Sequence, residues 1–107
     1  MTPEELNVAL KVEITNYRET NEISLKLKRL FMRMIWKEFK RSRYKNISNE
    51  IKYLSESHAY RQCCKGSIRY NPESQYKAIP YIMTIIRCSF ADTVVREKHK
   101  QAKIELK

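Results

Sequence analysis

The chain of 107 residues has a single glycine and only three prolines. A fold rich in β-sheet needs turn residues about every 8–12 positions, and this sequence does not supply them. The phosphate-binding loops of P-loop and Rossmann proteins need several closely spaced glycines, so both of these nucleotide-binding classes are excluded. These shortages favour a helical protein.

Long apolar runs are also lacking. None approaches the ~20 residues of a membrane-spanning helix, so we predict no membrane span. The N-terminus has no apolar signal core, and its acids Glu4, Glu5 and Glu13 differ from an acid-poor transit peptide. Hydrophobic residues nevertheless make up 42% of the chain, which is enough for a packed core. We therefore expect one helical domain over residues 1–107, with a basic C-terminal end.

The cysteines are too few and too poorly spaced for a disulfide framework. Cys63, Cys64 and Cys88 make an odd number, and neighbouring cysteines rarely bond to each other. The closely spaced Cys or His pairs typical of zinc sites do not occur, so we predict no metal and no cofactor. This pattern indicates an intracellular, reducing compartment, either cytoplasm, nucleus or an organelle matrix, with the thiols mainly buried.

Apolar side chains that recur at helical spacing predict an all-α fold, a small bundle of three to four helices. The first helix covers about residues 3–18 and begins with the capping pattern Thr2–Glu5. The second, residues 23–43, carries an apolar residue at every fourth position, and this stripe should face the core. Its members are Ile23, Leu27, Phe31, Ile35 and Phe39, flanked by Leu30 and Met34.

Two further helices are predicted after a short polar link. The third covers residues 48–65, with Ser48 as its N-cap and Gly66 as the left-handed residue that ends it. The fourth covers residues 72–105. We expect it to break or kink at Pro80, because proline removes an amide donor and disfavours helix at the residue before it. The β-branched run after Pro80 should still be helical, since the helical periodicity continues beyond it.

Catalytic groups are sparse. His58 lies on the apolar side of the third predicted helix, about one turn from Cys63 and Cys64, and a thiol–imidazole pair is conceivable there. No residue pattern supplies the orienting acid or the oxyanion donors that such a pair needs. His99 stands among lysines near the terminus. We predict that the protein is not an enzyme.

Basic residues are concentrated on the second predicted helix. Between Lys26 and Lys45 lie nine basic residues and one acid, Glu38. Five of these cations are three or four residues apart, so they stay within about a quarter-turn of a helix, away from the apolar stripe. This row, termed the basic ridge, consists of Lys26, Arg29, Arg33, Lys37 and Lys40. Arg41, Arg43 and Lys45 continue it.

Cations in one row repel one another, and a polyanion would relieve that repulsion. The formal net charge of +10 also favours an anionic ligand.

Two further features favour a nucleic acid. A second basic cluster comprises Arg96, Lys98, Lys100 and Lys103. The tyrosines suited to stacking on bases are Tyr44, Tyr60, Tyr70 and Tyr76. We predict a binding module for the backbone of RNA or DNA within a larger assembly, without sequence readout, since no recognition motif occurs. A plain solvated face stays open, and an anionic membrane surface is less favoured.

A smaller apolar strip lies on neither the stripe nor the ridge. Leu25, Met32 and Trp36 follow one another at spacings of seven and four. Trp and Met often anchor protein interfaces, so the strip is a candidate surface for a protein partner or a second copy of the chain. Packing against the fourth helix is the alternative.

The segment Ile35–Arg43, followed by Glu50–Leu54, resembles the second-to-third helix junction of the complex 1 LYR family, within residues 23–65. Phe39 stands at the position of that family's phenylalanine. The resemblance implies a small, basic, helical protein of the mitochondrial matrix, serving as an accessory or assembly subunit and often docked to an acyl carrier protein. It implies a protein–protein adaptor whose ridge and Trp36 face an acidic partner. The Leu-Tyr-Arg tripeptide itself is absent, so no residue of that motif is assigned a role.

Overall fold

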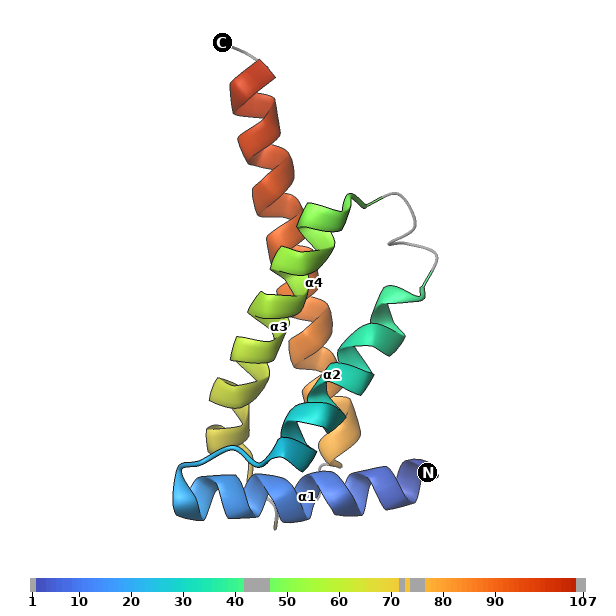
Figure 1. Ribbon diagram of the computed structural model, residues 1–107, viewed down its shortest axis with the longest axis vertical. Coiled ribbons are helices and arrows are strands. Elements are labelled where there is room, and N and C mark those ends of the chain that lie inside the picture. Colours follow the sequence, from blue (N-terminus) through green and yellow to red (C-terminus); the bar gives the residue numbers. More distant parts are fainter. Residues whose placement is uncertain (1, 42–46, 72, 74–76, 106–107) are drawn as a thin grey trace.

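The computed structural model describes residues 2–41, 47–71, 73 and 77–105, with side chains up to residue 100. All regular structure in these ranges is α-helical, which confirms the predicted all-α bundle. The helices are α1 (Pro3–Thr20), α2 (Leu25–Phe39), α3 (Asn49–Arg69) and α4 (Ala78–Glu105) (Figure 1).

Three helices stand side by side and the first crosses beneath them. In Figure 1, α1 lies across the end where α2 and α4 begin and where α3 finishes. The antiparallel pair α3 and α4 makes the most extensive contact between helices. The C-terminal end of α4 projects beyond the other helices. This helix alone is about 42 Å long at 1.5 Å per residue, and it sets the long axis of a molecule measuring 51 × 27 × 25 Å.

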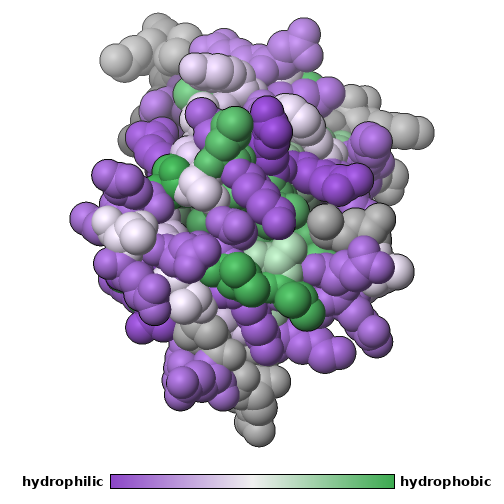
Figure 2. Space-filling view, turned by 60° about the horizontal axis from the view of Figure 1, so that its bottom comes forward, coloured by the Kyte–Doolittle hydropathy of each residue, from purple (hydrophilic) through white to green (hydrophobic). Residues whose placement is uncertain are grey.

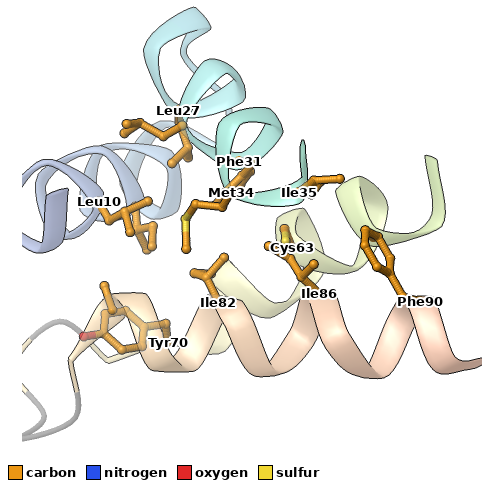
Figure 3. Close-up of a cluster of buried hydrophobic side chains, with 14 residues drawn as sticks. Leu10, Leu27, Phe31, Met34, Ile35, Cys63, Tyr70, Ile82, Ile86 and Phe90 are labelled. Atoms are coloured by element: carbon orange, nitrogen blue, oxygen red, sulfur yellow. The ribbon is translucent and has the colours of Figure 1, made fainter. Parts of the chain in front are cut away.

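All four helices contribute to one core. Figure 3 shows side chains from each of them converging, with Met34 of α2 pointing toward Ile82 of α4. The stripe predicted for the second helix is confirmed, because its central members are fully buried. They are Leu27, Phe31 and Ile35. At the end of the stripe, the ring of Phe39 stacks on Phe90 of α4, with centroids 4.4 Å apart.

Side-chain caps begin the first three helices. Thr2 and Ser48 cap α1 and α3 as predicted, each accepting a hydrogen bond from the amide three residues on, at 3.2 and 3.3 Å. Ser24 caps α2, which we did not predict: its Oγ accepts from the Leu27 amide at 3.0 Å. The same hydroxyl donates to Glu13 Oε2 at 2.7 Å, so this cap also ties α2 to α1.

The second helix is shorter than predicted. It ends at Phe39, and the amide of Lys40 turns back to bond the Lys37 carbonyl at 3.3 Å. Phe39 is the last apolar residue of the stripe, and the basic residues Lys40 and Arg41 that follow it are exposed. Of the remaining stretch predicted to be helical, residues 42 and 43 lie outside the described ranges.

Gly66 does not end α3, and that prediction is wrong. The helix continues to Arg69, and no glycine has a positive φ. Gly66 instead lies where α3 and α4 approach closely, because a Cβ at this position would overlap Cδ1 of Ile85. The hydroxyl of Tyr81 also donates to the Gly66 carbonyl at 2.8 Å. The missing side chain makes room for the neighbouring helix rather than for a turn.

Pro80 does not break a helix either. α4 begins at Ala78 instead of residue 72, so Pro80 stands in the first turn, where an amide donor is not required. One of the free amides of this turn, that of Ile79, donates to Asn7 Oδ1 of α1 at 2.9 Å. A side chain 72 residues away thus supplies a cap that local sequence does not reveal.

Candidate polyanion-binding face

All five cations of the basic ridge are exposed on one side of the molecule. Lys26, Arg29, Arg33 and Lys37 project from α2, and Lys40 follows its last turn. From Lys26 to Lys40 the ridge extends about 21 Å along the helix axis. Arg43 and Lys45, predicted to continue the ridge, lie outside the described residues.

No acid balances these charges within the described part of the chain. Glu38 is the single acid of α2, and it is only 1% exposed because it is turned inward. Two acids that contact α2 or its N-cap from other helices have other partners: Glu13 accepts from Ser24, and Glu56 accepts from the indole of Trp36 at 2.6 Å. Among the described residues, no ion pair involves a ridge cation.

Glu38 is held between two arginines. Nε of Arg41 lies 3.3 Å from Glu38 Oε2, and Nε of Arg87 on α4 lies 3.6 Å from Oε1. Both guanidinium groups are partly exposed, whereas the carboxylate is not. Oε1 has no hydrogen-bond partner among the residues described here. Arg41, predicted to bind a polyanion directly, is therefore also bound to an internal acid.

From the sequence, Glu38 was noted only as the single acid between Lys26 and Lys45, and Arg87 was not predicted to belong to the site. A signal for Glu38 was present, because it stands seven residues after Phe31 and four after Met34, on the buried face of the helix. Arg87 could not be found this way, since its pairing depends on how α4 packs against α2.

A cleft of about 570 Å³ opens where the C-terminal end of α2 meets the N-terminal parts of α1 and α4. Its basic side chains are Lys37, Lys40, Arg41 and Arg87. Its apolar side chains are Leu6, Met34, Ile79 and Met83. Glu38 completes the lining. Lys37 and Lys40 belong to both the cleft and the basic ridge, so the two features are continuous.

The predicted apolar strip is divided between surface and core. Leu25 is 61% exposed and Trp36 is 55% exposed, whereas Met32 packs against the buried cluster. The indole N–H of Trp36 is bonded to Glu56 on α3, so this ring lies beside α3 rather than against the fourth helix. Leu25 also lines a shallow hollow together with Arg29 and Arg33 of the ridge. Apolar and basic side chains therefore share this side of α2.

The tyrosines proposed as stacking groups do not line the ridge where they are described. Tyr70 is buried with its ring 4.9 Å from that of Tyr81, and Tyr60 meets Phe31 edge-on, with ring centroids 6.5 Å apart. Tyr70 follows the last residue of α3 and is buried in the core, so the prediction that it stacks on bases is wrong. Tyr60 is partly buried and packs against the core, away from the exposed cations of the ridge. Tyr44 and Tyr76 lie outside the described residues.

The C-terminal basic cluster is partly neutralised. Arg96 pairs with Asp92 and Lys100 pairs with Glu97, all on α4. Lys98 is exposed, and the side chain of Lys103 lies outside the described residues. This cluster is thus a weaker candidate than the ridge.

His58 and the cysteines do not form a nucleophilic pair. Nε2 of His58 lies 3.2 Å from Asp92 Oδ2 on α4. Burial raises the pKa of the Cys63 thiol to about 12, and Cys64 adds to the rise. Burial also raises the pKa of Cys64, so both groups stay as thiols near neutral pH.

Cys88 is exposed, whereas the sequence predicted mainly buried thiols. Among the described residues, no group of three or more His, Cys, Asp or Glu could hold a metal ion.

One helix has the length and composition to cross a membrane. The segment Ala78–Lys100 of α4 has 23 residues and a mean hydropathy of 1.3 in its most apolar window, and 33% of that window is buried within the bundle. The buried side carries Ile82, Ile86 and Phe90 in the core. The absence of a membrane span, expected from the sequence, stays a prediction.

Comparison of the chain with models of protein families, with curated proteins and with solved structures finds no significant match in any of the three. The resemblance to the LYR family therefore stays a prediction.

Proposed function

We propose that the protein is a non-enzymatic module that binds the sugar-phosphate backbone of RNA or DNA through the basic ridge. One observation carries this proposal: the outward side of α2 presents a row of exposed cations, while the single acid of that helix is turned into the core. The cations are therefore available to a ligand and are not already paired among the described residues.

The expected binding is electrostatic. A nucleic-acid backbone holds condensed counterions, and lysines or arginines that replace them release those ions into solution. Contacts of this kind go to phosphates, so they fix position and orientation but do not read base sequence. Affinity should consequently fall steeply as salt concentration rises.

The first prediction concerns three ridge residues that do not line the cleft. Changing them to glutamine should weaken binding to a labelled oligonucleotide and reduce the slope of log affinity against log salt by about 2 to 3, because each lost phosphate contact removes about one released ion. The substitutions are Lys26→Gln, Arg29→Gln and Arg33→Gln. Fluorescence anisotropy over a range of NaCl concentrations measures both quantities.

The matched control removes the same charge from the exposed side of α3, through Arg61→Gln, Lys65→Gln and Arg69→Gln. This variant should keep most of the affinity and most of the slope. Equal losses in the two variants would mean that net charge, not the ridge, attracts the ligand, and the proposal would be wrong.

A protein adaptor is the second candidate, favoured by the exposure of Leu25 and Trp36 beside the ridge. Large apolar side chains next to cations suit an acidic partner with apolar anchors. This function replaces the first if no oligonucleotide binds at about 50 mM salt and an acidic protein co-purifies whose binding is lost on Trp36→Ser.

A further inference from the structure

We propose that the cleft at the C-terminal end of α2 receives an unpaired base from a single strand whose backbone follows the basic ridge. This inference rests on the proposed function and adds the class of nucleic acid. The cleft would then be a second element of the site, continuous with the row of cations through Lys37 and Lys40.

The cleft and the ridge form one path. Lys37 and Lys40 are the last two cations of the ridge and also line the cleft. A strand that places phosphates along α2 therefore reaches the mouth of the cleft without a change of direction. Arg41 and Arg87 add two further cations at the same place, so phosphates on either side of an inserted base would meet positive charge.

The inner surface of the cleft suits the flat face of a base. Leu6, Ile79 and the two methionines, Met34 and Met83, supply apolar contacts from three different helices. Thioether groups pack favourably against aromatic rings and adapt to their shape. The volume of about 570 Å³ falls within the range usual for small-molecule sites.

Glu38 supplies the polar contact that such a site needs. Its carboxylate is almost fully buried, and Oε1 lacks a hydrogen-bond donor within the described residues. A buried carboxylate oxygen in this condition is costly, and an N–H of a base would satisfy it. Arg41 and Arg87 contact Glu38 through Nε, so the terminal nitrogens of each guanidinium group can donate to carbonyl or ring-nitrogen acceptors of the same base.

Only an unpaired base can use these contacts. In a duplex the bases are stacked and paired, and extracting one costs a few kcal/mol. A duplex can therefore occupy the ridge but not the cleft. We expect a preference for single strands that comes from the base itself and not from a larger number of phosphates.

The experiment compares a single strand of about 12 nucleotides with an abasic strand of the same length and with a duplex of the same phosphate number. The intact strand should bind about tenfold more tightly than the abasic strand and the duplex, as one buried hydrogen bond to a charged group predicts. Glu38→Met, which fills the same space without an acceptor, should reduce this ratio to about one. Leu6→Trp, which fills the cleft, should do the same, whereas Val8→Trp on the exposed side of α1 should not.

The outcomes separate the two proposals. If all three ligands bind equally and the glutamine changes on the ridge weaken them all, the ridge function stands and the cleft proposal is overturned. If the ratio of about ten persists in both cleft variants, the base is bound elsewhere, and the cleft proposal is again overturned. If none of the ligands binds, the proposed function itself fails.

Discussion

At the scale of single residues, Glu38 is an acid at a position where an apolar side chain would be expected. It occupies a core-facing position of α2, yet it is an acid, and its Oε1 has no hydrogen bond among the described residues. Replacing a buried ion pair by apolar groups of similar volume is often neutral or stabilising. Met34 and Met83 already line the same cleft, so a third methionine would fit the surroundings. An acceptor role toward a ligand accounts for the glutamate better than packing does.

Cys63 gives the protein a dependence of stability on alkaline pH. Burial raises its pKa from 9.0 to about 12 in the folded state. Between these values the unfolded chain releases the thiol proton while the folded chain keeps it. The free energy of unfolding should therefore be unaffected below pH 9 and fall above it, by about 1.4 kcal/mol per pH unit from this group. Urea unfolding at several pH values measures the slope.

The Cys63→Ala variant tests the assignment. It should lose this part of the slope, whereas Cys88→Ala, at an exposed position, should keep the slope of the unchanged protein. Burial also raises the pKa of Cys64 and raises the pKa of Tyr60 to about 12, so both groups add to the decline of the free energy of unfolding at alkaline pH in both variants. An unchanged slope in Cys63→Ala would show that the thiol is not the titrating group.

At the scale of helices, the sequence predicted correctly those features that depend on residues close together in the chain. The caps at Thr2 and Ser48 depend on hydrogen bonds within three residues, and the stripe of α2 depends on its own periodicity, so both were predictable. Gly66 and Pro80 were misread because their roles come from elsewhere. Gly66 makes room for α4. Pro80 stands in the first turn of α4, where the free amide of Ile79 donates to Asn7 of α1.

The contact between α3 and α4 at Gly66 can be measured by a double-mutant cycle. Alanine is favoured over glycine in a helix by about 1 kcal/mol, but its Cβ would overlap Ile85 Cδ1. Gly66→Ala should therefore gain little or lose stability in the unchanged protein. In an Ile85→Val background, which lacks that methyl group, it should stabilise by about 1 kcal/mol. Urea denaturation of the four proteins gives the coupling energy.

The Ile85→Val substitution alone serves as the control, since the cycle subtracts its own cost. If Gly66→Ala had the same effect in both backgrounds, the side chain of Ile85 would move aside at little cost, and the interpretation of Gly66 as a residue required for packing would be incorrect.

At the scale of the whole molecule, the distribution of charge was easier to predict than the shape of the site. Helical spacing alone placed the five ridge cations on one side, and they are exposed there. The cleft joins residues from α1, α2 and α4, so no single stretch of sequence describes it. Figure 2, which brings the end with α1 forward, shows hydrophobic side chains gathered among hydrophilic ones. Val8 and Val12 of α1 are exposed, and the sequence analysis did not predict an apolar surface on this helix.

The net charge of +10 should make folding sensitive to salt. Like charges repel more in the compact state than in the unfolded chain, and added ions screen that repulsion. Raising NaCl from about 10 to about 300 mM should therefore increase the thermal midpoint, as followed by circular dichroism.

The variant with glutamine at Lys26, Arg29 and Arg33 should show a smaller increase than the α3 control. The reason is that α2 carries more basic residues than α3 and its single acid is buried, whereas α3 carries the acids Glu50 and Glu56. A midpoint that fell with salt in the unchanged protein would mean that attractive ion pairs outweigh the repulsion.

The position of Trp36 has a practical consequence. It is the single tryptophan of the chain, it lies on the surface beside the basic ridge, and its indole is anchored to α3 by one hydrogen bond. Tryptophan fluorescence, excited apart from that of the tyrosines, therefore comes from the side of the molecule where a ligand would lie, and not from the core. The protein carries its own optical probe of occupancy, with no dye attached and no residue changed.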